Sequence, residues 1–111
     1  MDPVDLWRDA LERILTAHAA TPYANGDIRT EVVVDRRRDR FLLIDLGWRG
    51  PERVHGALVH VDVIDGKFWI QYDGTEEGVA DELVAAGVPR DRIVLASKHP
   101  DLRKYTDFAA A

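Results

Sequence analysis

The chain has 111 residues, of which 46% are hydrophobic and 32% are charged, and its formal net charge is −5. This composition predicts one globular domain, residues 1–111, and the lack of cysteine excludes disulfides, thiolate metal sites and cysteine nucleophiles. The acidic charge opposes direct high-affinity binding to DNA, so we expect any link to nucleic acid to run through a protein partner.

Helix and strand signals alternate along the chain. Asp2 before Pro3 is typical of a helix start, and Thr21-Pro22 predicts the end of that helix. Gly87 and the Pro89 beyond it predict the end of a second helix. The expected elements are, in order, a helix after Asp2, a turn at Asn25-Gly26-Asp27, strands over Ile28–Asp35 and Phe41–Trp48, a hairpin around Asp65-Gly66, a helix capped by Thr75, a short strand over Ile93–Ala96 and a tail from Lys98 to Ala111. This order predicts an α+β fold, in which a largely antiparallel sheet carries an N-terminal helix and a second helix after the fourth strand.

The hairpin around Asp65-Gly66 is the most informative segment, because an Asp-Gly pair favours a two-residue type I′ turn that fixes the strand register. An unbroken register gives these pairs on the core face: Val59/Tyr72, Val61/Ile70 and Val63/Phe68. It gives these pairs on the opposite face: Leu58/Asp73, His60/Gln71 and Asp62/Trp69. The second face mixes a histidine, an acid, an amide and a large aromatic ring, which makes it the candidate functional surface.

We interpret this second face, together with the acidic helix start beside it, as a partner-binding surface, because an aromatic ring surrounded by polar groups is typical of an interface hot spot. The alternative is a small enzyme or metal-dependent hydrolase, in which His60 and Asp62 transfer protons and Asp73 and Glu76 assist or hold a cation. No nucleophile-based triad can be assembled, because the chain has one serine, Ser97, and no cysteine. We therefore predict no catalytic residues, no metal site and no cofactor. The predicted partner-binding residues are His60, Asp62, Trp69, Gln71, Asp73 and Glu76.

Two other polar features have ordinary structural interpretations. The run from Asp35 to Arg40 alternates arginines with acids and predicts a solvated turn. His18 lies on the apolar stripe of the first helix, where a histidine at the edge of the core is expected. No apolar run is long enough to span a membrane, and the acidic segment Met1–Asp5 is unlike a signal peptide, so we expect a cytoplasmic protein that does not bind membranes.

The segments Val59-His60-Val61-Asp62, Gly66-Lys67-Phe68-Trp69-Ile70-Gln71 and Asp73-Gly74-Thr75-Glu76 form a specific combined pattern. With these segments, nearly the whole chain resembles the XisI family, the fdxN element excision controlling factors known from cyanobacteria. The resemblance implies an accessory protein that controls site-specific DNA excision through a nuclease-like partner, XisH, and not by its own catalysis. It supplies no catalytic residues. Self-association through the same face is the other binding mode that we consider.

Overall fold

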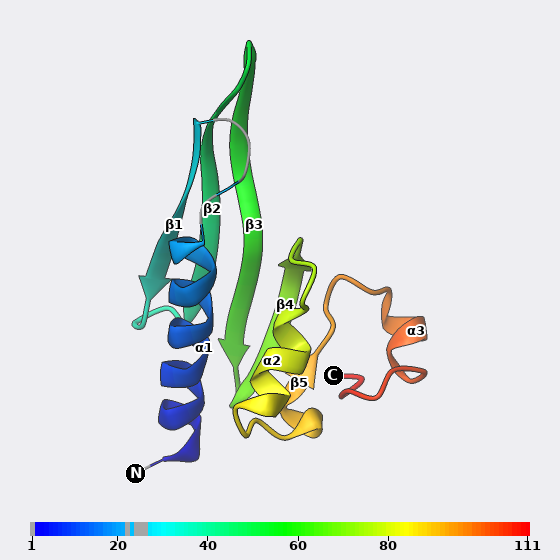
Figure 1. Ribbon diagram of the computed structural model, residues 1–111. Helices are drawn as coiled ribbons and strands as arrows, with labels where there is room; N and C mark the ends of the chain where they lie inside the picture. The colour runs from blue at the N-terminus through cyan, green and yellow to red at the C-terminus, as the bar shows by residue number, and fades with distance from the viewer. Residues whose placement is uncertain (1, 22, 24–26) are drawn as a thin grey trace.

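The computed structural model describes residues 2–21, 23 and 27–111. Its elements are α1 (Pro3–Ala20), β1 (Asp27–Asp35), β2 (Arg40–Arg49), β3 (Glu52–Ile64), β4 (Lys67–Asp73), α2 (Val79–Ala85), a 3₁₀ turn η1 (Arg90–Arg92), β5 (Ile93–Val94) and α3 (Pro100–Arg103). The five strands form one sheet in sequence order, with α1 and α2 on one face (Figure 1). Strands β1 to β4 are antiparallel, and β5 pairs in parallel with β4. This arrangement confirms the predicted α+β fold.

The core lies between the sheet and the two helices. The alternation along β3 and β4 buries Val61, Phe68 and Ile70, which are at most 2% exposed, and Leu83 of α2 packs against them. The three strand residues lie on the predicted core face of the hairpin, and the structure confirms their burial. The other fully buried large side chains are Leu11, Leu15, Phe41, Leu43, Val59, Val79, Val88 and Ile93.

Helix α1 begins as its sequence predicts. The Asp2 side chain accepts a hydrogen bond from the Val4 N–H at 3.0 Å, and Pro3 occupies the first helical position, where its missing N–H costs nothing. The helix ends at Ala20 with Thr21 as its C-cap. The turn predicted at Asn25-Gly26-Asp27 falls on residues that lie, apart from Asp27, outside the described part of the chain.

Helix α2 begins later than predicted. Its N-cap is Gly78 and not Thr75, so Glu76 and Glu77 precede the helix instead of forming its first turn. The capping oxygen comes from Asp73, whose carboxylate accepts the Val79 N–H at 2.7 Å. The same carboxylate also accepts the N–H and the hydroxyl of Thr75, at 2.9 and 2.6 Å. A strand residue therefore supplies the cap that local sequence assigned to Thr75.

The register of the β3–β4 hairpin is as predicted near the turn and wrong beyond it. Asp65 and Gly66 both have positive φ, as a type I′ turn requires, and Val61/Ile70, Asp62/Trp69 and Val63/Phe68 are paired. The pairing then shifts by one residue, because β4 contains a bulge at Gln71. The resulting pairs are His60/Tyr72 and Val59/Asp73 in place of the expected His60/Gln71, Val59/Tyr72 and Leu58/Asp73.

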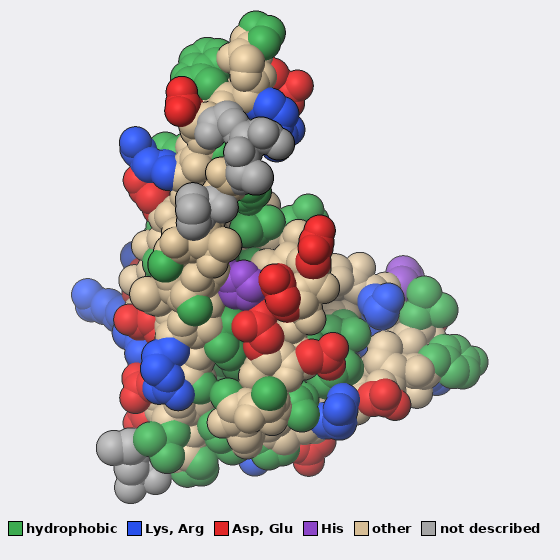
Figure 2. Space-filling view, viewed as in Figure 1, with side chains coloured by type: hydrophobic (Ala, Val, Ile, Leu, Met, Phe, Trp, Pro, Cys, Tyr) green, Lys and Arg blue, Asp and Glu red, His purple; other side chains and the backbone are tan. Residues whose placement is uncertain are grey.

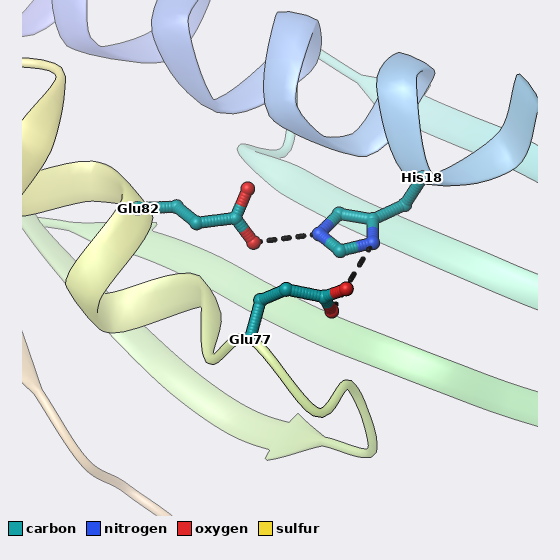
Figure 3. Close-up of side chains that lie close together, drawn as sticks. All are labelled: His18, Glu77 and Glu82. Atoms are coloured by element: carbon teal, nitrogen blue, oxygen red, sulfur yellow. Dashed lines mark hydrogen bonds and ion pairs between the residues drawn. The ribbon is translucent and has the colours of Figure 1, made fainter. Parts of the chain in front are cut away.

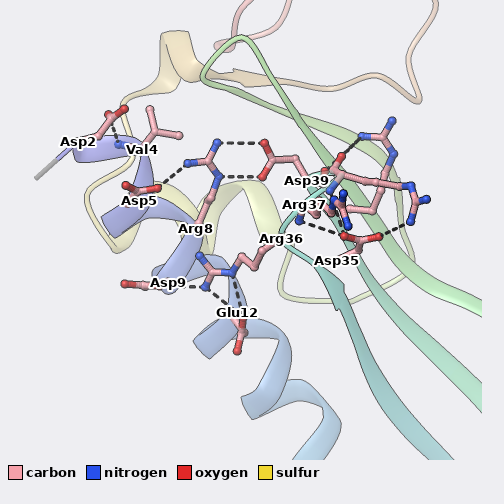
Figure 4. A network of polar contacts seen from close by, with 12 residues as sticks. Asp2, Val4, Asp5, Arg8, Asp9, Glu12, Asp35, Arg36, Arg37 and Asp39 are labelled. Carbon is pink, nitrogen blue, oxygen red and sulfur yellow. Dashed lines mark hydrogen bonds and ion pairs between the residues drawn. The ribbon is translucent and has the colours of Figure 1, made fainter.

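The arginine-rich turn between β1 and β2 is tied to α1 instead of being only solvated. Arg8 makes a bidentate ion pair with Asp39, at 2.8 and 3.0 Å, and Arg36 contacts acids of α1 (Figure 4). Within the turn, Asp35 accepts the N–H groups of Arg37 and Arg38 at 3.0 Å. The Arg38 N–H and guanidinium lower the pKa of Asp35 below its ordinary value of 3.8.

Strands β1, β2 and the first half of β3 extend past β4 as an arm, and Figure 2 shows hydrophobic side chains at its tip. Trp48 lies near this tip and is 50% exposed, with the Arg53 guanidinium 5.3 Å from its ring centroid. Among the residues that the structure describes, no helix combines the length and the hydropathy that crossing a lipid bilayer requires.

Candidate functional site

The sheet face turned away from α1 and α2, here called the open face, carries most of the predicted site. Strand pairing places Leu42 beside His60, Arg40 beside Asp62, and Trp69 on the far side of Asp62. The bulge adds Gln71 and Tyr72 to the same surface, where Tyr72 is 52% exposed. Alternation assigns these residues to one face because their neighbours along the strands, Phe41 and Val61, point into the core.

Asp62 is the centre of the polar part of the open face. Asp62 is only 8% exposed, and both oxygens of its carboxylate have polar partners. One oxygen contacts His60 Nε2 at 2.8 Å and Arg40 Nε at 3.3 Å, and the other accepts from Gln71 Nε2 at 3.3 Å. A carboxylate this desolvated needs such partners, since an unpaired buried charge is strongly unfavourable. The four side chains therefore hold one another in place and present a preformed polar surface.

Trp69 lies beside this polar group and is held by the C-terminal segment. The Arg103 guanidinium stacks 5.6 Å from the Trp69 ring centroid, and the carbonyls of Ala96 and Lys98 fix that guanidinium at 3.1 and 3.0 Å. Within the tail, Phe108 packs against the core, whereas Tyr105 is 77% exposed.

The structure separates Asp73 and Glu76 from the other four predicted residues. Because of the bulge, Asp73 pairs with the buried Val59 and points to the helix side, where one oxygen caps α2 at Val79 and the other accepts from Thr75. Glu76 is exposed in the loop before α2, where it lines a hollow together with His18 and Glu77. The geometry therefore assembles His60, Asp62, Trp69 and Gln71 on one surface and excludes the expected acidic helix start from it.

Two residues of the open face, Arg40 and Tyr72, were missed by the sequence analysis. The pairing of β2 with β3, which places Arg40 against Asp62, could have indicated the first of them. A second polar cluster was also missed, because its members are far apart in sequence. His18 of α1 contacts Glu82 of α2 at 2.6 Å through Nε2, and Glu77 lies 4.0 Å from its Nδ1 (Figure 3).

Comparison with known proteins gives a consistent result. The family model described as XisI protein matches residues 1–110. A crystal structure of a XisI-like protein from Anabaena variabilis superposes with a TM-score of 0.88 and 32% identity, covering 97% of this chain and 99% of that one. The structure of fdxN element excision controlling factor XisI from the same organism gives a TM-score of 0.82 and 29% identity, covering 99% of this chain and 100% of that one. No curated protein matches the chain.

Proposed function

The chain belongs to the XisI family, and we propose that it is an accessory factor that controls excision of a DNA element through a nuclease-like, XisH-type partner. This proposal extends the name of its structural relative, fdxN element excision controlling factor, to the present chain. The observation that carries the binding role is the open face, where Trp69 borders the preformed network around Asp62.

The open face has the physical properties of a protein-binding surface. A tryptophan contributes a large apolar area to an interface, and flanking groups that are already ordered lose little conformational entropy on binding. Here His60 and Gln71 are held by Asp62, and Arg103 holds one side of the Trp69 ring. Tyr72 adds a second accessible aromatic ring next to His60. The surface can therefore bind a partner without rearranging its polar groups.

One observation favours the enzymatic alternative, namely the 2.8 Å contact between His60 and Asp62. A histidine oriented by a carboxylate is a common element of proton-transfer sites. However, Arg40 and Gln71 share the same carboxylate, and Asp73 and Glu76 lie elsewhere. The four-residue site that the enzymatic interpretation needs is not assembled, so we prefer the binding role.

The test is co-expression with an XisH-type protein, followed by pull-down and calorimetric titration of wild type and Trp69→Ala. We expect the substitution to weaken association by about 2 kcal/mol or more, or about 30-fold in Kd, because it removes the central aromatic group. Tyr105→Ala is the control for the loss of an exposed aromatic ring, since this residue is 77% exposed. Far-UV circular dichroism checks that both variants are folded.

A second variant, His60→Ala, tests the polar part of the face. If folded Trp69→Ala and His60→Ala both bind the partner as tightly as wild type, the partner site lies elsewhere and the proposal is wrong. Sedimentation of the protein alone tests the other binding mode, which is self-association through the open face. A dimer that Trp69→Ala dissociates would assign the open face to self-association.

A further inference from the structure

The cluster of His18, Glu77 and Glu82, here called the His18 cluster, is independent of the open face and lies on the helix side of the sheet (Figure 3). It joins the last turn of α1, the loop before α2, and the first turn of α2. Each of the three side chains offers one ligand atom, and these atoms lie within 4.8 Å of one another. Two carboxylates thus converge on one imidazole at the junction of the two helices.

The surroundings of the His18 cluster favour a cation. Two adjoining hollows, of about 520 and 180 Å³, open beside it, and their described lining residues include three glutamates but no lysine or arginine. Figure 2 shows acidic side chains gathered next to a histidine on this face. This contrasts with the surroundings of the β1–β2 turn, where Arg8 pairs with Asp39 and Arg36 pairs with Asp9 of α1. Apart from His18 itself, the two glutamates of the cluster therefore face no cationic side chain in these hollows.

The distances suit a small divalent ion after a modest adjustment. A zinc ion bound at about 2.0–2.2 Å holds its tetrahedral ligand atoms about 3.3–3.5 Å apart. Glu82 now lies 2.6 Å from Nε2 and Glu77 lies 4.0 Å from Nδ1, so the two carboxylates contact different ring nitrogens, and one of them must swing toward the nitrogen that binds the ion. Glu77 can do so freely because its side chain is 64% exposed, and that of Glu82 is 30% exposed. One ring nitrogen would bind the ion, and the side-chain torsions of Glu77 would supply the adjustment.

The donor set selects the class of ion. One imidazole nitrogen with two carboxylates suits zinc and similar divalent transition metals, whereas magnesium and calcium prefer all-oxygen sites. Three protein ligands leave at least one position for water or another ligand. We propose that the His18 cluster is a binding site for Zn²⁺ or a related transition-metal ion, which links α1 to α2.

The test is a zinc titration of the whole protein, followed by calorimetry and by thermal unfolding. We expect zinc to raise Tm by roughly 10 °C when free zinc is ~100-fold above Kd, because the ion binds only the folded arrangement. His18→Gln should weaken zinc binding by about 100-fold or more, since the loss of a ligand costs at least as much as the loss of an outer-shell partner. His99→Gln is the matched control, because His99 lies beside Asp101 at an exposed site.

A second variant keeps the proposal testable if His18→Gln does not fold. Glu77→Gln changes a largely exposed side chain, so it should fold normally and still lower the affinity for zinc. Equal zinc binding by wild type and by these cluster variants would overturn the proposal. So would the absence of any zinc-dependent change in Tm, or an equal response to magnesium.

Discussion

Truncation of Phe68 tests whether the hairpin and α2 share one core. Phe68 is fully buried, and its strand neighbours in β3 and β5 are Val63 and Ile93. Phe68→Ala removes the whole ring and leaves a cavity, because neighbours on both strands are fixed by backbone pairing and cannot collapse into the space. We expect a loss of about 3–5 kcal/mol in the free energy of unfolding.

This magnitude predicts a large shift in the thermal midpoint. Unfolding entropy near 60 °C is about 2.1 cal/mol/K per residue, or about 0.23 kcal/mol/K for a chain of 111 residues. A loss of about 4 kcal/mol therefore lowers Tm by about 15 °C or more. The same loss is a large fraction of the 5–15 kcal/mol that is typical for the stability of a single domain.

The assay is urea unfolding followed by far-UV circular dichroism, with wild type and variant fitted for the midpoint and for m. An unchanged m with a lower midpoint shows a loss of stability without a change in the surface exposed on unfolding. Tyr105→Ala is again the control, because its exposed ring should contribute less than about 0.5 kcal/mol. A loss below about 1 kcal/mol for Phe68→Ala would refute the argument that this ring is central to the core.

Two further predictions concern charge. The protein alone should bind duplex DNA only weakly in a gel shift at ~150 mM salt, because its net charge of −5 opposes phosphate contact; sub-micromolar binding would show that this reasoning is wrong. The second concerns Asp35, whose pKa in the folded state lies below its ordinary value of 3.8. The ionised carboxylate therefore stabilises the fold at pH values above 3.8. This contribution is lost as the pH falls through the folded-state pKa. The difference in Tm between wild type and Asp35→Asn should accordingly be constant near neutral pH and shrink in acid. A difference that grows in acid would contradict the hydrogen bonds that Asp35 accepts from Arg37 and Arg38.

The sequence by itself determined the elements whose signals are local. Asp2 and Pro3 start α1 because a side-chain acceptor and a missing donor match the unpaired N–H groups of a helix start. Asp65 and Gly66 form the predicted turn because both tolerate positive φ. The register is correct over the pairs nearest that turn. The family resemblance rested on patterns of the same local kind, and the family model confirms it.

Only the tertiary structure decided which face each residue beyond the turn occupies. Side chains alternate with a period of two, so the single bulge at Gln71 sends Tyr72 to the open face and Asp73 to the helix side. On the helix side, the Asp73 carboxylate accepts the N–H of Val79, a contact that forms only in the folded chain.

The His18 cluster shows the same limit at longer range. His18 and Glu82 are separated by 64 positions, and each occupies an unremarkable place on its own helix. They meet because Leu11 and Leu15 bury one stripe of α1, and Leu83 buries one stripe of α2, against a common sheet. Packing of these apolar stripes fixes the two helices side by side, and the polar side chains at their edges are brought together as a consequence.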